Sequence, residues 1–367
     1  MLIFLTGASG SLGRNALLYL LEQDASVQIR ALSRSDNAGK AILTAAGNHS
    51  KRVQIVSGDL DDEDALRTGM EGCQAVVHMA AKVGDVGILP DFLHANVVGT
   101  RNMLTAARKA GVHKFVHVSS FVVLAKHHDL AAGPKPYPYT ADNPIPPPTT
   151  ERPPAHTDLI PDWAPYSKSK ALAEELVLNA HTTDSNAKLI ACSLRIGWLW
   201  SANEAVLLPR LIDVVNNPGW SILPRTWPNA TCHMQNACEA IWCALQHGRQ
   251  GVAYEIADPQ GPMYMESWAP RLVALATGMP EVKPPSEAWR MKIGWMWPMI
   301  GLMDYMPQSL KWPKSWYTAM TRQALALLYW DFRLDTTRAK EEIRYVGRVG
   351  WEEGCEEVKI HRLGIEQ

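Results

Sequence analysis

The first 125 residues alternate short apolar runs with helical segments, and this rhythm constrains the fold more than any other feature. The apolar runs are almost continuous, which is typical of strands buried on both faces of a parallel sheet. They span Leu2–Thr6, Val27–Leu32, Val53–Ser57, Ala75–Met79 and Phe115–Ser119, and helical segments between them include Ala16–Glu22, Asp62–Met70 and Asn96–Ala110. The pattern predicts an α/β fold built on a Rossmann-type, doubly wound parallel sheet.

A glycine-rich turn follows the first predicted strand and opens the first predicted helix. Its sequence is TGASGSLG, with G-x-x-G-x-x-G spacing rather than G-x-G-x-x-G. Gly7 permits the tight turn, Gly10 lets the backbone approach a pyrophosphate, and Gly13 allows close packing of helix on strand. The first amides of the helix would face the phosphates. We therefore expect a dinucleotide to contact Thr6, Gly7, Ser9, Gly10, Ser11, Leu12 and Gly13.

The residues after the second and third strands bear on the adenosine end of such a dinucleotide. The segment Arg30–Ser35 contains no Asp or Glu for a ribose 2′-hydroxyl, whereas Arg34 can pair with a 2′-phosphate. This favours NADP(H) over NAD(H); the alternative is that Arg34 is only a solvated charge, as an exposed Arg after a strand often is. Asp59, followed by Leu60, is expected either to accept from the adenine amino group or to cap the next helix.

Tyr166 and Lys170 lie four residues apart in a helical segment, so they share one helix face. A phenol has an ordinary pKa of about 10, and a neighbouring ammonium favours the phenolate. Ser120 ends a predicted strand at the carboxyl edge of the sheet, where open α/β folds bind ligands. The three side chains predict proton transfer at a carbonyl or alcohol oxygen. The alternative for Ser120 is a turn or a helix cap.

Another predicted strand ends at the same edge with the sequence HMAA. Its small alanines leave room for a dinucleotide, so Met79, Ala80 and Ala81 are further candidates for cofactor contact. We expect His78 to be structural, because a lone histidine at such a point is more often structural than catalytic.

Composition excludes several classes of partner. The formal net charge of −1 over 367 residues gives no basic surface for a nucleic acid, so we expect a small ligand. The six cysteines form no C-x-x-C pair and no Cys/His cluster, which predicts no metal site and a reduced, cytoplasmic location. The N-terminal apolar run is too short for a secretory signal, and no uninterrupted apolar run reaches the roughly 18 residues of a transmembrane helix.

The motifs, taken in order, resemble the extended short-chain dehydrogenase/reductase family, which includes NAD(P)-dependent epimerases and dehydratases. They are TGASGSLG, GDL, HMAA, NVVGTRNML, SS and YSKSK. Later segments agree with the resemblance, namely Leu194–Gly197, residues 232–245, Val252–Ala257 and Asp335–Lys340. Within the family, the branch of 3β-hydroxysteroid dehydrogenases and related hydrophobic-ketone reductases is the most similar.

The resemblance implies roles for four residues of this chain. Ser120, Tyr166 and Lys170 would form the catalytic triad, with Tyr166 as acid/base, Ser120 positioning the oxygen and Lys170 also holding the nicotinamide ribose. Asn96 matches the Asn of a family helix and would belong to the cofactor site.

Three departures weaken an interpretation as a sugar-nucleotide epimerase or 4,6-dehydratase. The family's V-Y-G is replaced in Val122–Ala125, Ile196 stands where the family has proline, and no Asp-Glu pair follows Ser120.

The resemblance and the shifts in composition predict two parts. Residues 1–195, together with about 230–258, would form the NAD(P)-binding domain, and residues 196–229 and 259–367 a smaller, mostly C-terminal substrate lobe with a hydrophobic lid. The proline-rich segment 133–165 would be a surface loop, either a stiff insertion or one that shapes the substrate mouth.

All 14 tryptophans follow residue 160, and the segment Trp289–Met320 is dense in Trp and Met. This segment predicts an apolar pocket or lid, or equally a core. Residues of about 290–306 also suit peripheral contact with a membrane interface. A homodimer is compatible with the sequence.

We therefore expect an NAD(P)-dependent oxidoreductase that interconverts a secondary alcohol and a ketone. Its substrate would be small and hydrophobic, such as a sterol, polyketide or terpenoid of secondary metabolism. One alternative is an isomerase or epimerase that uses the cofactor transiently, and net NADPH consumption would distinguish it. Another is a regulator that senses NADP without turnover, against which the intact set of Ser120, Tyr166 and Lys170 argues.

Overall fold

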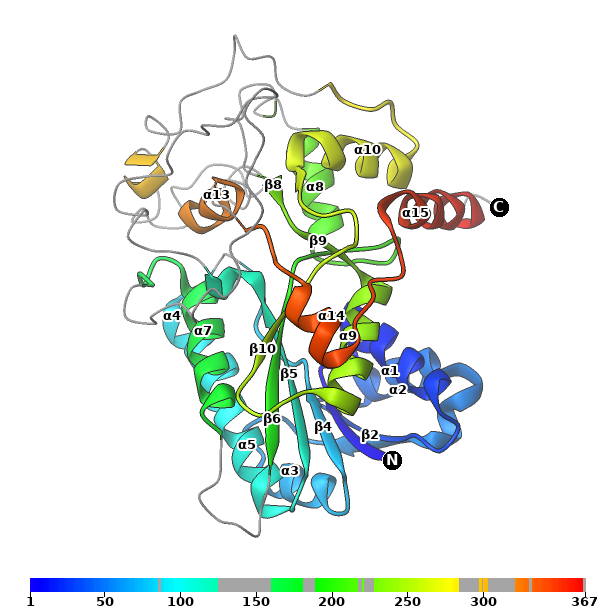
Figure 1. Cartoon of the computed structure of the whole chain (residues 1–367), viewed down its shortest axis with the longest axis vertical. Helices are drawn as coiled ribbons and strands as arrows, with labels where there is room; N and C mark the ends of the chain where they lie inside the picture. The colour runs from blue at the N-terminus through cyan, green and yellow to red at the C-terminus, as the bar shows by residue number, and fades with distance from the viewer. Residues whose placement is uncertain are drawn as a thin grey trace.

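The computed structural model describes residues 1–84, 87–124, 160–180, 189–216, 220, 228–283, 297–298, 300–302, 321–329 and 332–365. Within them, a seven-stranded sheet has the order β10-β6-β5-β4-β1-β2-β3, and all its pairs are parallel (Figure 1). The strands are β1 (Leu2–Thr6), β2 (Gln28–Ser33), β3 (Val53–Ser57), β4 (Ala75–His78), β5 (Lys114–Ser120), β6 (Ile190–Ile196) and β10 (Ala253–Ile256). The order reverses between β1 and β4, so the predicted doubly wound α/β sheet is confirmed.

Helices cover both faces of this sheet. On one face lie α1 (Ser11–Gln23), α2 (Asp36–Ala46) and α9 (Met234–His247), and on the other α3 (Glu63–Met70), α5 (Gly99–Lys109) and α7 (Pro165–Leu178). The helix α14 (Thr337–Ile343) packs against α9 and β10.

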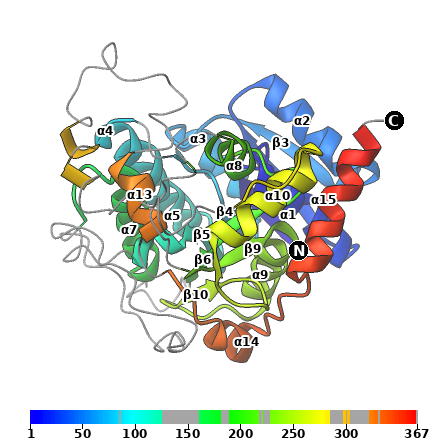
Figure 2. The ribbon, with the colours of Figure 1, turned by 90° about the horizontal axis from the view of Figure 1, so that it is seen from above.

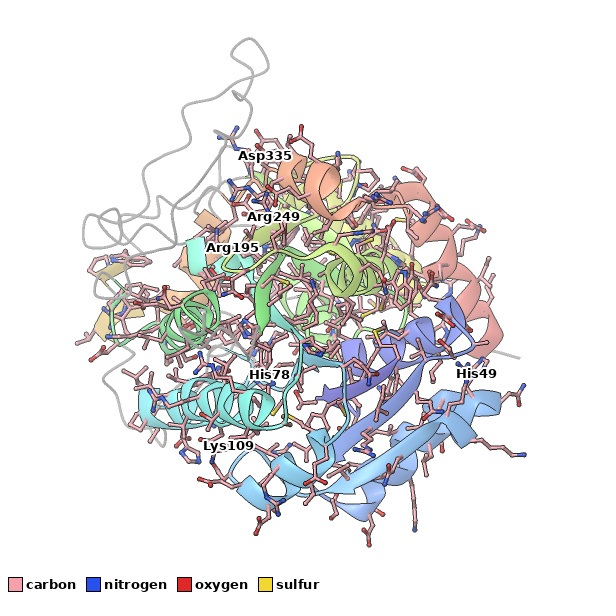
Figure 3. All side chains as sticks on the ribbon, turned by 60° about the horizontal axis from the view of Figure 1, so that its bottom comes forward. His49, His78, Lys109, Arg195, Arg249 and Asp335 are labelled. Atoms are coloured by element: carbon pink, nitrogen blue, oxygen red, sulfur yellow. The ribbon has the colours of Figure 1, made fainter. Side chains whose placement is uncertain are left out.

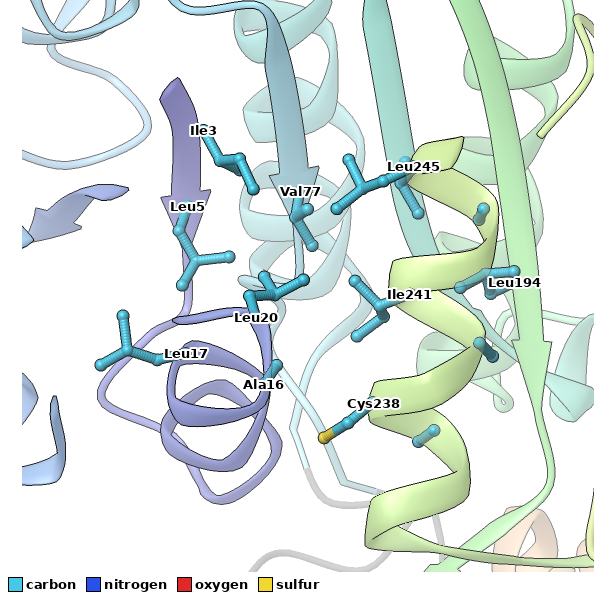
Figure 4. Close-up of a cluster of buried hydrophobic side chains, with 14 of the residues drawn as sticks. Ile3, Leu5, Ala16, Leu17, Leu20, Val77, Leu194, Cys238, Ile241 and Leu245 are labelled. Carbon is cyan, nitrogen blue, oxygen red and sulfur yellow. The ribbon is translucent and has the colours of Figure 1, made fainter. Parts of the chain in front are cut away.

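The alternation of side chains along β1 shows how one strand serves both faces. Ile3 and Leu5 are buried in the cluster that contains Ile241 of α9, as Figure 4 shows. Phe4, between them, is buried in the opposite cluster with Met103 of α5. Because successive side chains of a strand point to opposite faces, a continuous apolar run is required here.

The helix predicted at Asn96–Ala110 begins earlier than expected. It starts as α4 (Leu89–Phe92), passes through a π-helical turn, η2 (Leu93–Val98), and continues as α5. Its end is as predicted, because Gly111 follows the C-cap with a left-handed φ of 69°.

A small lobe stands over the carboxyl edge of the sheet (Figures 1 and 2). It contains the paired strands β7 (Trp198–Trp200) and β9 (Thr231–His233), the pair β8 (Pro228–Asn229) and β11 (Met263–Tyr264), and the helices α8 (Leu207–Val215), α10 (Met265–Thr277), α13 (Arg322–Tyr329) and α15 (Trp351–Ile365). Trp200, Leu211, Trp268 and Val358 belong to its buried core.

Most of the proline-rich segment 133–165 and of Trp289–Met320 lies outside the described residues. Of the second segment, Ile300 is buried in the core of the small lobe, and Trp297 packs against that core and meets Trp163 edge-on at 5.6 Å. No helix in the described part of the chain has the length and apolar character needed to cross a membrane. The membrane contact at about 290–306 stays a prediction.

Candidate active site

A cleft of about 1240 Å³ separates the carboxyl edge of the sheet from the small lobe. All but one of the site residues predicted from the sequence line it. They are Thr6, Gly7, Ser9, Gly10, Ser11, Leu12, Gly13, Arg34, Asp59, Leu60, Met79, Ala80, Ala81, Ser120, Tyr166 and Lys170. The fold thus brings together residues that lie far apart in sequence, from Thr6 to Lys170.

The glycine turn is packed so tightly that side chains are excluded from it. Gly7 has a φ of 73°, and a Cβ there would lie 2.8 Å from the backbone nitrogen of Ala80. A Cβ on Gly13 would lie only 2.0 Å from the carbonyl oxygen of Gly7. These contacts hold the start of α1 against the ends of β1 and β4, as the glycine spacing predicts.

The start of α1 fits a pyrophosphate. Gly10 is its N-cap, so no side chain caps the first amides, and the first turn contains no acidic residue. Uncapped amides and the positive end of the helix dipole attract an anion at the floor of the cleft. Ser11 Oγ donates to the carbonyl of Asn203 at 3.0 Å and ties this turn to the small lobe.

The residues after β2 present a cation to the cleft. Arg34 is exposed and lines it. The neighbouring Ser35 is occupied as the N-cap of α2, where its hydroxyl accepts from the amide of Ala38 at 3.3 Å. Asp36, the first acidic residue here, begins α2 and is not among the residues that line the cleft.

One alternative for Asp59 is excluded. The cap of the following helix is Asp62, whose carboxylate accepts from the amide of Ala65 at 2.9 Å. Asp59 instead accepts from the amide of Asp61 at 2.9 Å and lines the cleft beside Leu60. The capping role proposed for Asp59 is therefore wrong, because the helix begins three residues later than that role requires.

Tyr166 and Ser120 both line the cleft. Pro165 opens α7, which suits proline because the first amides of a helix have no partner within it. Burial raises the pKa of Tyr166 to about 12, and the hydrogen bond with Ser120 opposes this rise. Burial outweighs the opposing hydrogen bond, so the phenol is neutral at physiological pH.

Lys170 is buried on the same face of α7. Its ammonium donates to the carbonyl of Val118 at 2.7 Å and lies 3.4 Å from Nε2 of His117. Burial lowers the pKa of Lys170 to about 8, against the opposing charge of Glu174. The ammonium therefore remains the main form at neutral pH.

Asn96 is the one predicted site residue that the structure does not bring to the cleft. It is 2% exposed, and both ends of its side chain have partners within the protein. Its Oδ1 accepts from the amide of Lys82 at 2.7 Å, and its Nδ2 donates to Ser169 Oγ at 2.9 Å. Ser169 in turn donates to the carbonyl of Tyr166 at 2.9 Å. Asn96 therefore fixes the start of α7 from behind the cleft.

His78 lies in the interior, where Figure 3 labels it, and is structural as expected. Its Nδ1 is 2.8 Å from Thr6 Oγ1, and its Nε2 is 3.0 Å from Thr100 Oγ1. The Thr100 hydroxyl donates to the carbonyl of Asn96 at 2.6 Å, so it must accept from His78 Nε2–H. Burial lowers the pKa of His78 to about 3, which keeps the imidazole neutral.

Gln323 is a site residue that sequence reasoning did not identify. This residue of α13 is buried at the cleft, where Oε1 accepts from the amide of Tyr166 at 3.2 Å and Nε2 donates to the carbonyl of Gly84 at 3.3 Å. It follows Tyr166 by 157 residues. No local pattern connects positions so distant in the chain.

Sequence reasoning also did not identify the residues that form the apolar wall of the cleft. One face of α8 lines it with Leu207, Arg210, Leu211 and Val214, at the spacing of a helix face. Trp198, which packs against Phe121 at 5.4 Å between ring centres, continues the wall toward Ser120. The periodicity of α8 was a usable signal, but nothing in the sequence showed which partner its apolar face meets.

This geometry defines a dinucleotide-dependent site of the Ser-Tyr-Lys type, and comparison with known proteins identifies the family. The sequence pattern of the NAD dependent epimerase/dehydratase family matches residues 3–257. The chain therefore belongs to this family, and the predicted membership of the extended short-chain dehydrogenase/reductases is confirmed. It is an NAD(P)-dependent oxidoreductase of that family.

Two curated relatives match along nearly the whole chain. One is 4-hydroxy-2-methyl-3-oxo-4-farnesyl-3,4-dihydroquinoline-1-oxide ketoreductase of Stigmatella aurantiaca, 30% identical over 98% of this chain and 96% of its own. The other is 2-alkyl-3-oxoalkanoate reductase of Stenotrophomonas maltophilia, 28% identical over 98% of both chains. Among solved structures, that of gox2253 superposes with a TM-score of 0.69 at 21% identity, covering 100% of this chain and 98% of the other, which shows the shared fold.

Proposed function

We propose that this protein is an NADPH-dependent reductase of a hydrophobic ketone. The observation that carries the proposal is the neutral phenol of Tyr166, which lines the same cleft as Ser120 and a set of apolar side chains of the small lobe. A protonated phenol is the form that can give a proton to a carbonyl oxygen. The two relatives named as a ketoreductase and an oxoalkanoate reductase support reduction as the direction.

Different residues of the cleft have different roles in such a reduction. Bound NADPH supplies the hydride that reaches the carbonyl carbon. Ser120 and Tyr166 hold the carbonyl oxygen, and Tyr166 gives it a proton, so a secondary alcohol forms. The phenolate that remains is stabilised by the nearby Lys170 ammonium until solvent restores its proton.

The preference for NADPH rests on the end of β2. Arg34 lines the cleft there, and no acidic residue of the turn between β2 and α2 lines the cleft to bind a 2′-hydroxyl. A guanidinium suits the planar, bidentate recognition of a phosphate.

A hydrophobic substrate follows from the wall that faces the catalytic residues. Leu207, Leu211 and Val214 of α8 line it together with Met265 and Leu327. Burying apolar substrate surface there stabilises the complex by roughly 25 cal/mol per Å². The names of the two relatives specify substrates with apolar groups, a farnesyl group in one and an alkyl group in the other.

The test is consumption of NADPH with a panel of apolar ketones, followed through the absorbance of the reduced nicotinamide. We expect turnover, with one NADPH oxidised for each alcohol formed. Cofactor binding without net oxidation of NADPH by any ketone would favour the epimerase or the regulator instead.

The cofactor preference is tested with Arg34→Ala, and with Lys40→Ala on the exposed part of α2 as the matched control. Loss of a charged hydrogen-bonding partner of the 2′-phosphate should weaken NADPH about 10- to 100-fold. NADH affinity should change by less than about twofold, and Lys40→Ala should leave both unchanged. Equal loss of NADPH and NADH affinity in Arg34→Ala would refute the NADP assignment.

A further inference from the structure

A chain of four buried side chains runs from Lys170 through His117 and Ser193 to Glu174. Lys170 Nζ is 3.4 Å from His117 Nε2, His117 Nδ1 is 3.2 Å from Ser193 Oγ, and Ser193 Oγ donates to Glu174 Oε2 at 3.0 Å. None of the four is more than 4% exposed. Glu174 and Lys170 are four residues apart on α7, so the chain begins and ends on one face of one helix.

Lys170 and Glu174, at the two ends of this chain, determine which atom donates and which accepts in each of its hydrogen bonds. An ammonium only donates, so His117 Nε2 must accept from Lys170. A carboxylate only accepts, so the Ser193 hydroxyl must donate to Glu174. His117 is thereby held as the neutral tautomer with its hydrogen on Nδ1, which donates to Ser193. A protonated His117 would leave the Lys170 ammonium without this acceptor.

The charges around the chain agree with a neutral imidazole. Burial lowers the pKa of His117 well below its ordinary value, and the nearby charge of Lys170 acts in the same direction. The His78 ring, from β4, stacks on His117 at 5.8 Å. At the far end, Arg195 of β6 donates to Glu174 at 2.9 and 2.7 Å and balances its charge.

An ammonium has three N–H groups, and the structure accounts for two of them. One donates to the carbonyl of Val118, at 2.7 Å, and one faces His117. Because the three N–H groups diverge tetrahedrally, the third is turned away from both acceptors. Lys170 also lines the cleft, so this third N–H is the one left for a ligand there.

We propose that His117 is a positioning residue for the reductase described above, holding the Lys170 ammonium so that one N–H serves the cleft. The inference rests on the proposed function, in which Lys170 stabilises the Tyr166 phenolate. It adds that a side chain outside the cleft sets both the orientation and the charge of Lys170. His117 itself touches neither substrate nor cofactor in this account.

The test compares His117→Asn with His117→Gln, two polar variants that keep different halves of the imidazole. A Gln amide reaches the place of Nε2, so it can still accept from Lys170. An Asn amide reaches only the place of Nδ1, so it keeps Ser193 as a partner and leaves Lys170 without its acceptor. Thermal unfolding of both variants shows whether either is damaged beyond this change.

The first measurement does not depend on turnover. In protein containing ¹³C-labelled lysine, the Cε signal of Lys170, assigned with Lys170→Met, is followed against pH in the absence of cofactor. A hydrogen bond to the charged form favours that form, so its loss should lower the Lys170 midpoint in His117→Asn by about one pH unit. His117→Gln should keep the midpoint of the native protein.

The second measurement is the pH profile of kcat for ketone reduction. In His117→Asn the alkaline limb should move down by the same amount as the Lys170 midpoint, with KM within about twofold of native, and in His117→Gln it should not move. Equal midpoints in all three proteins, or equal losses in both variants, would overturn the proposal. Absence of turnover in the native protein, with the Asn/Gln difference intact in the titration, would refute the reductase alone.

Discussion

The phenol of Tyr166 shows burial and hydrogen bonding in competition at a single residue. Burial raises the pKa of Tyr166 to about 12, whereas the hydrogen bond with Ser120 acts in the opposite direction. The balance favours a proton donor over a base at neutral pH. The phenol is therefore in the protonated form that the proposed reduction of a carbonyl requires.

The buried imidazole of His78 should make the free energy of unfolding depend on pH in the acidic range. In the unfolded chain it takes up a proton below its ordinary pKa of about 6.5, whereas in the folded chain it stays neutral down to about 3. The unfolded state binds more protons in this window, so the free energy of unfolding falls as the pH falls below about 6.5 and is unaffected above it. The loss from His78 should be about 2 kcal/mol by pH 5.

Urea unfolding at a series of pH values measures this loss, with His78→Gln as the variant that cannot titrate. The native protein should lose about 2 kcal/mol more than His78→Gln between about pH 6.5 and pH 5. The same acid dependence in both proteins would contradict a neutral buried His78.

At the residue scale, motif residues could be predicted and their partners could not. Tyr166, Lys170 and Ser120 were found because a helix spacing and the end of a strand are local signals. Asn96 was expected at the cofactor but lies behind the cleft, because burial depends on the packing of α7 over η2. Gln323 left no signal, since its contact with Tyr166 exists only in the folded chain.

The unit of β1, the glycine turn and α1 determines the geometry of the cofactor site at the scale of elements. A Cβ on Gly13 would meet backbone at 2.0 Å, whereas a Cβ on Gly10 would meet only the Gly7 carbonyl oxygen, at 3.3 Å. Gly13 is thus required by the packing of α1 against the turn. Gly10 is instead required because the pyrophosphate must approach the backbone closely there.

These two glycines should respond differently to substitution by alanine. Gly13→Ala forces α1 away from β1, so it should lower the free energy of unfolding by about 1–3 kcal/mol and weaken cofactor binding as well. Gly10→Ala should keep native stability within about 0.5 kcal/mol and weaken NADPH about tenfold or more, because the methyl group occupies the path of the pyrophosphate. Urea unfolding and cofactor titration separate the two effects, and equal destabilisation in both variants would contradict this assignment.

The strands were predicted more closely than the helices because burial on both faces leaves a continuous apolar run. The runs Leu2–Thr6 and Val53–Ser57 match β1 and β3 at both ends. The helix that starts at Leu89 was predicted to start at Asn96, because the π-helical turn of η2 interrupts the regular helical period.

At the scale of the whole molecule, side chains connect the small lobe to both halves of the site. Ser11 of the glycine turn donates to Asn203, and Gln323 of α13 joins the first turn of α7 to Gly84. These two contacts fix the small lobe over the cleft that Tyr166 lines. The packing of this lobe depends on contacts between distant segments, so its composition alone could not place it.

Gln323→Ala should disturb catalysis without disturbing the cofactor. It leaves the partly buried amide of Tyr166 without its acceptor and releases α7 from α13, so kcat should fall about tenfold. The dissociation constant for NADPH should stay within about twofold of native, as should both values in the control Gln235→Ala, an exposed glutamine of α9. A change confined to NADPH affinity would show that Gln323 belongs to the cofactor site instead.

The most direct test of the account is single-turnover oxidation of bound NADPH by an apolar ketone, in the native protein and in Tyr166→Phe. With Tyr166 as the acid, the variant should react about 10²- to 10⁴-fold more slowly while binding NADPH with nearly native affinity. Reaction at the native rate in Tyr166→Phe would contradict the role of Tyr166 and, with it, the proposed mechanism.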